Sequence, residues 1–286
     1  MTTRPAVVAL GGGHGLSATL RAARRYAGDI AAVVSVADDG GSSGRLRSAF
    51  GIPAPGDLRR CLVALADDSL WAAVLEHRFD AGELEGHAFG NLLIAALADY
   101  TGDFEVALHE TGRLLGLEGR VFPATREPVV LKAEVEGTSV EGQVAVSNAG
   151  RISGISVIPP DACTPDGALE AVAGANQIVV GPGSLFTSVL AVVAVPAIRE
   201  ALAAAAGRKV YVCNLRPQVP ETAGFDVAHH VSALADHGLE VDVVLCHPGA
   251  LPMGDVAVEC VEERIAVADL SEHDPALLSE ALARLV

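Results

Sequence analysis

The first hundred residues alternate between short apolar runs and longer segments with helical spacing. Ala6–Leu10 and Ile30–Val36 are apolar runs, the second rich in β-branched residues, which is typical of parallel strands that are covered on both faces. Leu16–Tyr26 has helical spacing, and Asp57, an apt N-cap, predicts a helix that runs through Ala66. The pattern therefore predicts strands and helices in alternation, joined by glycine-rich loops.

Between residues 129 and 146 the apolar period changes to two. Val129, Leu131, Ala133 and Val135 alternate with other side chains, and Glu136-Gly137 supplies a turn. This segment is predicted to be a small antiparallel β-hairpin inserted into the domain.

The alternation of strands and helices resumes after the hairpin. Gln177–Val180, Val210–Cys213 and Val241–Leu245 are β-rich runs, each followed by a loop and a helical pattern. No repeat or linker separates the two halves of the chain. We therefore predict one domain over residues 1–286, an α/β fold with a three-layer, doubly wound, mostly parallel Rossmann-like sheet and the hairpin insertion at 129–146.

A long uncharged stretch covers Ala171–Ile198. Gly181-Pro-Gly-Ser184 interrupts it in the middle, so a buried strand, a turn and the start of a buried helix explain it better than a membrane span. The apolar run near the N-terminus ends in glycines and has no signal-peptide core. We expect a cytoplasmic protein without membrane insertion.

Composition narrows the choice of ligand. Half of the 286 residues are hydrophobic but only 4% are aromatic, which predicts a core of Ala, Val and Leu. The formal net charge is -16, so we expect no nucleic-acid partner. Lysines are rare beside arginines. An anion site would therefore be built from Arg side chains, backbone amides and helix N-termini.

The loop Gly11-Gly-Gly-His-Gly-Leu-Ser17 follows the first predicted strand. Glycines let backbone N–H groups approach a phosphate, and the next helix presents its positive end. Leu16 is incompatible with a dinucleotide fingerprint, and the chain has no Gly-Lys pair for a P-loop. The alternative is a tight turn without a ligand.

Three further polar loops also follow predicted strands. Asp38-Asp39 with Ser42 and Ser43 could hold a divalent ion with phosphate, bind sugar hydroxyls, or only form an Asx turn before a helix. Gly181–Ser188 resembles a second anion site, and two such sites facing one crevice could hold a diphosphate. The fourth loop, 214–225, is long and polar.

His87-Ala-Phe-Gly-Asn91 precedes a very apolar helix through Ala98. A histidine here could cap, pack or act chemically. The sequence contains no Gly-x-Ser-x-Gly signature of a nucleophile, so the loops indicate a phosphate-bearing ligand more clearly than a reaction.

Taken together, six ordered motifs resemble the gluconeogenesis factor family (YvcK-like), which belongs to the superfamily of the 2-phospho-L-lactate transferases (CofD-like). The motifs are Gly11-Gly-Gly-His-Gly-Leu-Ser17, Val36-Ala-Asp-Asp-Gly-Gly-Ser-Ser-Gly-Arg45, Pro55-Gly-Asp-Leu-Arg59, Gly86-His-Ala-Phe-Gly-Asn91, Gly181-Pro-Gly-Ser-Leu-Phe-Thr-Ser188 and Tyr211-Val-Cys-Asn214.

The resemblance implies a bacterial protein that binds a UDP-sugar, typically UDP-N-acetylglucosamine, and links carbon metabolism to cell-wall growth and cell shape. It also leaves room for a homo-oligomer and for regulatory partners in cell-wall growth. The residues expected to bind the nucleotide-sugar are Gly11, Gly12, Gly13, Gly15, Leu16, Asp38, Asp39, Gly40, Gly41, Ser42, Asp57, Arg59, Asn91, Gly181, Gly183, Ser184, Thr187, Asn214, Gln218 and Phe225.

Some positions depart from the family pattern. His14, Arg60, Phe186 and Phe225 stand where relatives usually have Thr, Asn, Tyr and Tyr. Glu272 takes the place of an Arg that would suit a diphosphate, so the affinity for a UDP-sugar could be weakened or redirected.

The competing interpretation is an enzyme of the transferase branch, which moves a phospholactyl group from a nucleotide diphosphate donor to a deazaflavin in F420 synthesis. Mg²⁺ would then be held by Asp38 and Asp39. Ala37-Asp-Asp-Gly-Gly differs from the Thr-Gly-Asp-Asp style of that branch, which favours a binding protein without catalytic or metal-binding residues. An NAD(P)-dependent oxidoreductase is disfavoured by the glycine spacing.

Overall fold

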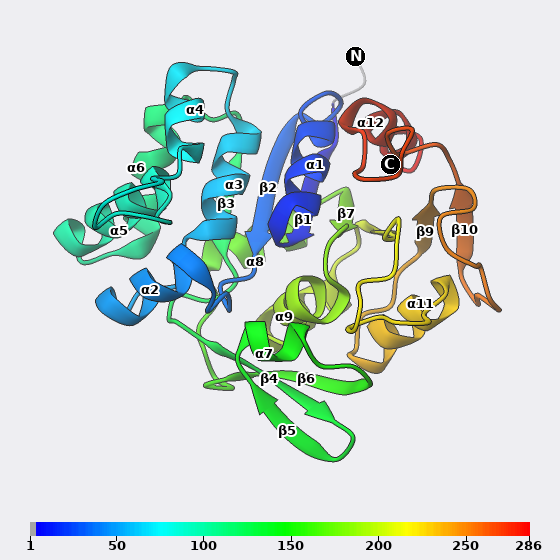
Figure 1. Ribbon diagram of the computed structural model, residues 1–286. Helices are drawn as coiled ribbons and strands as arrows, with labels where there is room; N and C mark the ends of the chain where they lie inside the picture. The colour runs from blue at the N-terminus through cyan, green and yellow to red at the C-terminus, as the bar shows by residue number, and fades with distance from the viewer. Residues whose placement is uncertain (1–3) are drawn as a thin grey trace.

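The computed structural model describes residues 4–286 and shows a seven-stranded parallel sheet with helices on both faces (Figure 1). Its strand order is β10-β9-β8-β7-β1-β2-β3, with a separate three-stranded antiparallel sheet in the order β5-β4-β6. The strands of the large sheet are β1 (Ala6–Gly11), β2 (Asp29–Val34), β3 (Arg120–Pro123), β7 (Gln177–Val180), β8 (Arg208–Val212), β9 (Val243–Cys246) and β10 (Glu259–Glu262).

Helices α1, α3 and α12 pack together on one face of this sheet, and α8, α9 and α10 lie on the other (Figure 1). The α-helices and the π-helix η1 are α1 (Gly13–Ala23), α2 (Gly41–Phe50), α3 (Gly56–Leu65), α4 (Leu70–Glu76), α5 (Phe89–Thr101), α6 (Phe104–Leu115), α7 (Gln143–Ser147), α8 (Asp166–Gly174), η1 (Leu185–Val189), α9 (Leu190–Val193), α10 (Pro196–Ala204), α11 (Val227–Asp236) and α12 (Pro275–Ala283). The predicted three-layer α/β fold is confirmed.

The strand order reverses between β1 and β7. The chain runs from β1 outward through β2 to β3, then returns to pair β7 with the other side of β1 and continues through β8 and β9 to β10. Loops at the carboxyl ends of two strands on either side of such a reversal diverge and leave a crevice. The loops after β1 and β7 are both glycine-rich, so the crevice has flexible backbone on two sides.

The central strands are buried along almost their whole length. In β1, β2 and β7 nearly every residue is shielded from solvent, which explains the uninterrupted apolar runs. The buried core consists largely of Ala, Val and Leu, as the composition predicted, and Tyr211 and Phe186 are its largest side chains.

The edge strands were not predicted. β3 and β10 have four residues each and are only partly buried. Each hydrogen-bonds to a neighbouring strand on one side only and is partly exposed to solvent. Because each run is short and includes charged residues, no apolar pattern marks it as a strand.

The insertion is larger than the predicted hairpin. β4 (Val130–Val135) and β5 (Thr138–Glu141) form the hairpin, and β6 (Ile152–Ile158) pairs antiparallel with the other side of β4. The end of the predicted segment, residues 143–146, lies in the short helix α7, which ends at Ser147. β6 contains Ser153 and Gly154 and has exposed positions on both faces, which hides its strand pattern.

Two predicted helix starts need correction. α1 begins at Gly13, three residues before the predicted start, so Gly13, His14 and Gly15 of the glycine-rich loop belong to the helix. Asp57 is not the N-cap of α3: that position is held by Pro55, and Asp57 lies in the first turn with its carboxylate directed to another helix.

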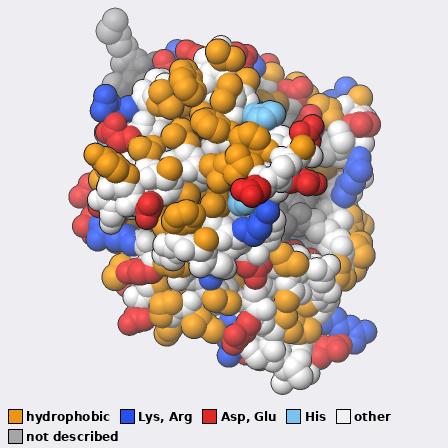
Figure 2. Space-filling view, turned by 60° about the vertical axis from the view of Figure 1, so that its left-hand side comes forward, with side chains coloured by type: hydrophobic (Ala, Val, Ile, Leu, Met, Phe, Trp, Pro, Cys, Tyr) orange, Lys and Arg blue, Asp and Glu red, His pale blue; other side chains and the backbone are white. Residues whose placement is uncertain are grey.

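The outer helices carry apolar side chains on their surface. In Figure 2 the left-hand side of Figure 1 is turned toward the viewer. Hydrophobic side chains, drawn in orange, gather on this face, where α4, α5 and α6 lie. The exposed large apolar residues of these helices are Leu70, Trp71, Tyr100, Val106 and Leu114.

Within residues 4–286, none of the helices combines the length and the apolar composition of a bilayer span. One pair of helical segments, Leu185–Val193 and Pro196–Ala204, meets that test only when taken together, and it is bent by 76°.

Candidate functional site

A cavity of about 480 Å³ opens at the carboxyl edge of the sheet, beside the reversal between β1 and β7. Its walls come from the start of α1, the loops after β7 and β8, and the segment that leads into α12. The charged or titratable side chains that line it are His14, Arg21, Arg60, Glu76, Arg216, Glu272 and His273.

The start of α1 forms one wall of this cavity. Gly13 has a φ of +67°, a left-handed conformation that favours glycine. Gly15 allows a close approach of a second loop, because a Cβ there would lie 2.3 Å from the carbonyl oxygen of Pro182. The N–H groups in the first turn of a helix have no partner within the helix. The first turn of α1, with His14 and Gly15 at the cavity wall, therefore offers backbone donors to an anion.

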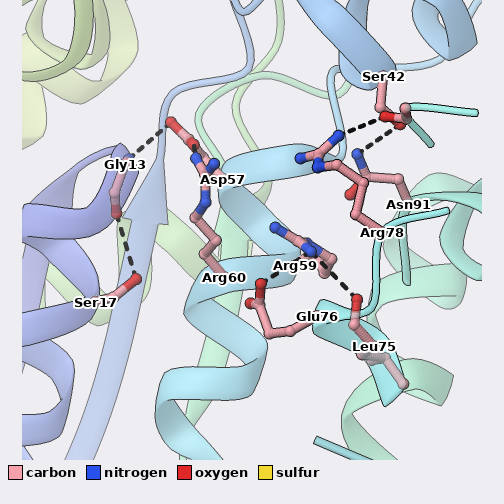
Figure 3. Close-up of polar contacts among 11 residues, drawn as sticks. Gly13, Ser17, Ser42, Asp57, Arg59, Arg60, Leu75, Glu76, Arg78 and Asn91 are labelled. Atoms are coloured by element: carbon pink, nitrogen blue, oxygen red, sulfur yellow. Dashed lines mark hydrogen bonds and ion pairs between the residues drawn. The ribbon is translucent and has the colours of Figure 1, made fainter. Parts of the chain in front are cut away.

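One of these donors already has a partner within the protein. The N–H of Gly13 donates to Oδ2 of Asp57 at 2.8 Å, and Nη1 of Arg60 lies 2.8 Å from Oδ1 of the same carboxylate (Figure 3). Asp57 therefore connects the starts of α1 and α3 and holds Arg60 at the cavity wall. An incoming anion would meet Arg60 and the other amides of α1, while Gly13 stays bound to Asp57.

The cations of the cavity come from three separate segments. Arg21 lies on α1, Arg60 on α3, and Arg216 in the loop after β8, where its Nη2 donates to the carbonyl oxygen of Asp269 at 2.6 Å. Burial lowers the pKa of His273 to about 4, so this side chain is neutral near pH 7. Three guanidinium groups thus face Glu76 and Glu272, which leaves the titratable lining net positive in a chain whose overall charge is -16.

A hydrogen-bonded network joins the loops after β7 and β8. Oδ1 of Asn214 accepts from the N–H of Gly183 at 3.3 Å, and its Nδ2 donates to Oε1 of Gln218 at 3.2 Å. Nε2 of Gln218 in turn donates to Oγ of Ser184 at 3.0 Å. This network joins the two loops that form a second wall of the cavity.

The predicted second anion site is filled by a side chain of the protein. Oε1 of Glu221 accepts from the N–H groups of Phe186 and Thr187, at 2.7 and 3.3 Å, and its Oε2 accepts from Oγ1 of Thr187 at 3.1 Å. Glu221 is buried, which raises the pKa of its carboxyl. The start of η1 is thus capped by a carboxylate in the position where a phosphate was expected.

Phe225 belongs to an aromatic cluster. Its ring meets Phe186 edge-on at a centroid distance of 6.1 Å and also contacts His229 and His230. Phe186 is itself buried. In the part of the chain that the structure describes, Phe225 is outside the set of residues that line the cavity.

Asp38 and Asp39 are held by different segments. Oδ1 of Asp38 accepts from the N–H of Gly40 at 2.9 Å, and burial raises the pKa of this carboxyl. Oδ1 of Asp39 accepts from the N–H of Val144 in α7, also at 2.9 Å. One oxygen of each carboxylate is thus bonded to a different segment of the protein. Among residues 4–286 no group of three or more His, Cys, Asp or Glu side chains is placed to hold a metal ion.

Arg59, Ser42 and Asn91 are outside the set of residues that line the cavity, and Figure 3 shows their contacts. Arg59 is 2% exposed and bonds Glu76 at 3.0 Å and the carbonyl oxygen of Leu75 at 3.2 Å, so it ties α3 to α4. Nδ2 of Asn91 donates to Oγ of Ser42 at 3.1 Å.

The predicted site residues thus fall into three groups. Gly15, Gly183, Asn214 and Gln218 line the cavity. Those that support its walls through packing or hydrogen bonds are Gly11, Gly12, Gly13, Leu16, Asp57, Gly181 and Ser184. Asp38, Asp39, Gly40, Gly41, Ser42, Arg59, Asn91, Thr187 and Phe225 bond or pack elsewhere.

Sequence reasoning missed several residues of the cavity. Arg21 lies in the predicted helix Leu16–Tyr26 and Arg216 in the polar loop 214–225, and neither was predicted as a site residue. Their role depends on which loops meet at the reversal of the strand order, which no local pattern reveals. The scarcity of lysine was the one signal that pointed to arginine.

Comparisons with known proteins agree with the fold and the motifs. The model of the 2-phospho-L-lactate transferase CofD family matches residues 7–281. A putative gluconeogenesis factor of Mycobacterium leprae is 41% identical, with 97% of this chain and 85% of the relative covered. The gluconeogenesis factor of Halalkalibacterium halodurans is 42% identical, with 93% and 84% covered.

A solved structure is also similar along nearly its whole length. The crystal structure of a member of the UPF0052 family from Bacillus halodurans superposes with a TM-score of 0.93 at 37% identity, and 99% of each chain is covered. The resemblance inferred from six motifs is confirmed: the chain belongs to the gluconeogenesis factors, within the CofD family of 2-phospho-L-lactate transferases.

Proposed function

We propose that this protein is a UDP-sugar-binding regulator that takes UDP-N-acetylglucosamine into the cavity lined by the start of α1 and the loops after β7 and β8. The observation that supports it best is the cavity itself, which places the first turn of α1 and three guanidinium groups around one space. Helix N-termini and arginines are the groups that bind diphosphates in proteins.

The diphosphate would lie between the start of α1 and Arg60, with Arg21 and Arg216 as further cationic contacts. Asn214 and Gln218 offer amide groups to the hydroxyls of a sugar or to a base. The relatives are named gluconeogenesis factors, and we extend that to a role that links carbon metabolism with cell-wall growth and cell shape. A homo-oligomer and regulatory partners stay predictions.

A thermal-shift panel of nucleotides tests this proposal. A ligand that binds only the native state stabilises it by about 2.7 kcal/mol at one hundred times its dissociation constant, which is a readily measured rise in melting temperature. We expect UDP-N-acetylglucosamine to stabilise the protein, and NAD and ATP to have little effect. Stabilisation by NAD alone would show that the ligand class is wrong.

The second candidate function is a phospholactyl transferase that uses a nucleotide diphosphate donor, a deazaflavin and Mg²⁺. The match to the CofD family model favours it. The sequence Ala37-Asp-Asp-Gly-Gly, which departs from the Thr-Gly-Asp-Asp style of that branch, counts against it. We expect no turnover with Mg²⁺, a phospholactyl donor and a deazaflavin acceptor. Product formed by the unmodified protein and lost in Asp38→Asn would establish the enzyme instead.

A further inference from the structure

A serine and a histidine from distant parts of the chain meet beside the start of α2. Oγ of Ser42 lies 3.1 Å from Nδ1 of His87, although 45 residues separate them. Nδ2 of Asn91 donates to the same Oγ at 3.1 Å. With Asn91 donating to this oxygen, Ser42 can donate its own hydroxyl hydrogen to Nδ1 of His87 in the tautomer whose ring proton is on Nε2.

His87 is suited to accept that proton. Partial burial, together with the nearby charges of Arg45 and Arg78, lowers the pKa of its imidazole, so the ring is neutral near pH 7. The loop that carries His87 is held in place from two sides: Arg45 donates to the carbonyl oxygen of Glu85 and Arg78 to that of Gly86. A hydroxyl hydrogen-bonded to a positioned neutral imidazole is the arrangement that activates a serine.

The surroundings of Ser42 offer groups that would stabilise an oxyanion. Ser42 and Ser43 lie in the first turn of α2, a helix of 10 residues, where backbone N–H groups have no partner within the helix. Ser42 is 4% exposed, but the preceding Gly41 is exposed and His87 is half-buried, so the group lies just below the surface.

Asn91 adds an independent sign of a ligand. The residue is 2% exposed, and its Oδ1 has no hydrogen-bond partner among the residues that the structure describes. A buried acceptor without a donor costs free energy. A hydroxyl or amide of a bound substrate would satisfy it.

We propose that Ser42 and His87 form a nucleophile and base that hydrolyse esters carrying a negative charge, at a centre separate from the nucleotide-sugar cavity. Arg45 and Arg78 give this centre its preference for an anionic substrate. None of Ser42, His87 and Asn91 is among the residues that line the cavity.

The reaction has two steps that share one proton route. In the first, Oγ of Ser42 bonds to the ester carbonyl carbon, its proton passes to Nδ1 of His87, and the bond to the leaving alcohol breaks as that proton is transferred to it. In the second, water attacks the acyl-serine with His87 as the base. The acid is released and the proton returns to Ser42.

Labelling with diisopropyl fluorophosphate tests the nucleophile without knowledge of the natural substrate. The reagent forms a bond between phosphorus and Oγ and loses fluoride. We expect one adduct, mapped to Ser42 by mass spectrometry. The adduct should be absent in Ser42→Ala, and the labelling rate should fall about a hundredfold or more in His87→Gln, the usual effect of removing a general base.

Matched variants separate this chemistry from loss of structure. Ser48→Ala on the same helix and His77→Gln at an exposed position should label at the wild-type rate. If Ser42→Ala does not fold, the labelling rate of His87→Gln still tests whether His87 activates Ser42. An unlabelled wild-type protein, or labelling that His87→Gln leaves unchanged, would overturn the proposal.

A separate experiment tests the preference for an anionic substrate. The para-nitrophenyl half-ester of succinate is anionic, and para-nitrophenyl butyrate is a neutral ester of the same chain length. We expect the wild-type protein to hydrolyse the anionic ester at least tenfold faster, and Arg78→Ala, which leaves Arg45 in place, to reduce that preference. Equal rates for the two esters in the wild-type protein would contradict the assignment of an anionic substrate.

Discussion

Gly13 and Gly15 lie two residues apart and are required for different physical reasons. At Gly13 a Cβ would meet nothing within 4 Å, so only its φ of +67° favours glycine. At Gly15 a Cβ would lie 2.3 Å from the carbonyl oxygen of Pro182, an atom of rigid backbone. The conformational demand of Gly13 could be predicted from the sequence, whereas the contact of Gly15 could not.

Alanine substitutions should separate the two roles. Gly13→Ala should lower the free energy of unfolding by about 1 kcal/mol, the cost of a left-handed residue. Gly15→Ala should lower it by about 2 to 3 kcal/mol, because the two loops must move apart. Gly174→Ala, which meets open space in a helix, should raise it slightly. Urea unfolding measures all three, and equal losses at positions 13 and 15 would refute this distinction.

Glu221 replaces the phosphate that the sequence predicted at the start of η1. Glu221→Ala leaves the amides of Phe186 and Thr187 buried without an acceptor and should cost about 3 kcal/mol. Glu221→Gln keeps an acceptor oxygen and should cost much less. The difference in unfolding free energy between the two variants checks this, and a mild effect of the alanine would mean that water replaces the carboxylate.

Buried histidines should make the protein sensitive to acid. Burial lowers the pKa of His230 and His273 to about 4. The folded state therefore binds fewer protons than the unfolded state between pH 6.5 and 4. As the pH falls through that window, each histidine lowers the free energy of unfolding by roughly 3 kcal/mol. The raised pKa values of Asp38 and Glu221 act in the opposite direction.

His273→Gln isolates one of these contributions. Its amide can still donate to the carbonyl oxygen of Cys213, the partner of Nε2 of His273. The variant should lose less unfolding free energy than the wild-type protein between pH 6.5 and 4, measured by urea melts at each pH. An identical pH dependence in the two proteins would contradict a neutral buried His273.

At the scale of elements, the strands that could be predicted from the sequence are those that are buried along their whole length. β1, β2 and β7 are buried along their length and form apolar runs that were predicted to within two residues. β6 was missed because Ser153 and Gly154 interrupt its pattern and its pairing with β4 is non-local. The pairing of Ser42 with His87 was missed for the same reason: the two residues come together only through the packing of α2 against α5.

The insertion is anchored to the main sheet through Asp39. The carboxylate of Asp39 accepts from the N–H of Val144 at the start of α7. Asp39→Ala should remove this anchor at a cost of about 1 kcal/mol and increase hydrogen exchange in residues 143–147. Exchange in β1 and β7 should stay unchanged and serves as the internal control. Unaltered exchange in α7 would show that other contacts hold it.

At the scale of the whole molecule, charge and topology act together. The chain carries a net charge of -16, yet three arginines from separate segments gather where the strand order reverses. The doubly wound fold, and hence a ligand crevice at the carboxyl edge of the strands, could be predicted from the alternating pattern. The arginines of that crevice could not, because the tertiary fold alone brings α1, α3 and the loop after β8 together.

Isothermal titration of UDP-N-acetylglucosamine into the wild-type protein, Arg21→Ala and Arg25→Ala tests the central claim most directly. Arg21 lines the cavity, whereas Arg25 is an exposed arginine just beyond the same helix. We predict binding to the wild-type protein, about tenfold weaker binding to Arg21→Ala from the loss of roughly 1.4 kcal/mol, and unchanged binding to Arg25→Ala. No binding to the wild-type protein, or equal affinity in all three, would contradict a nucleotide-sugar site in the cavity beside the start of α1.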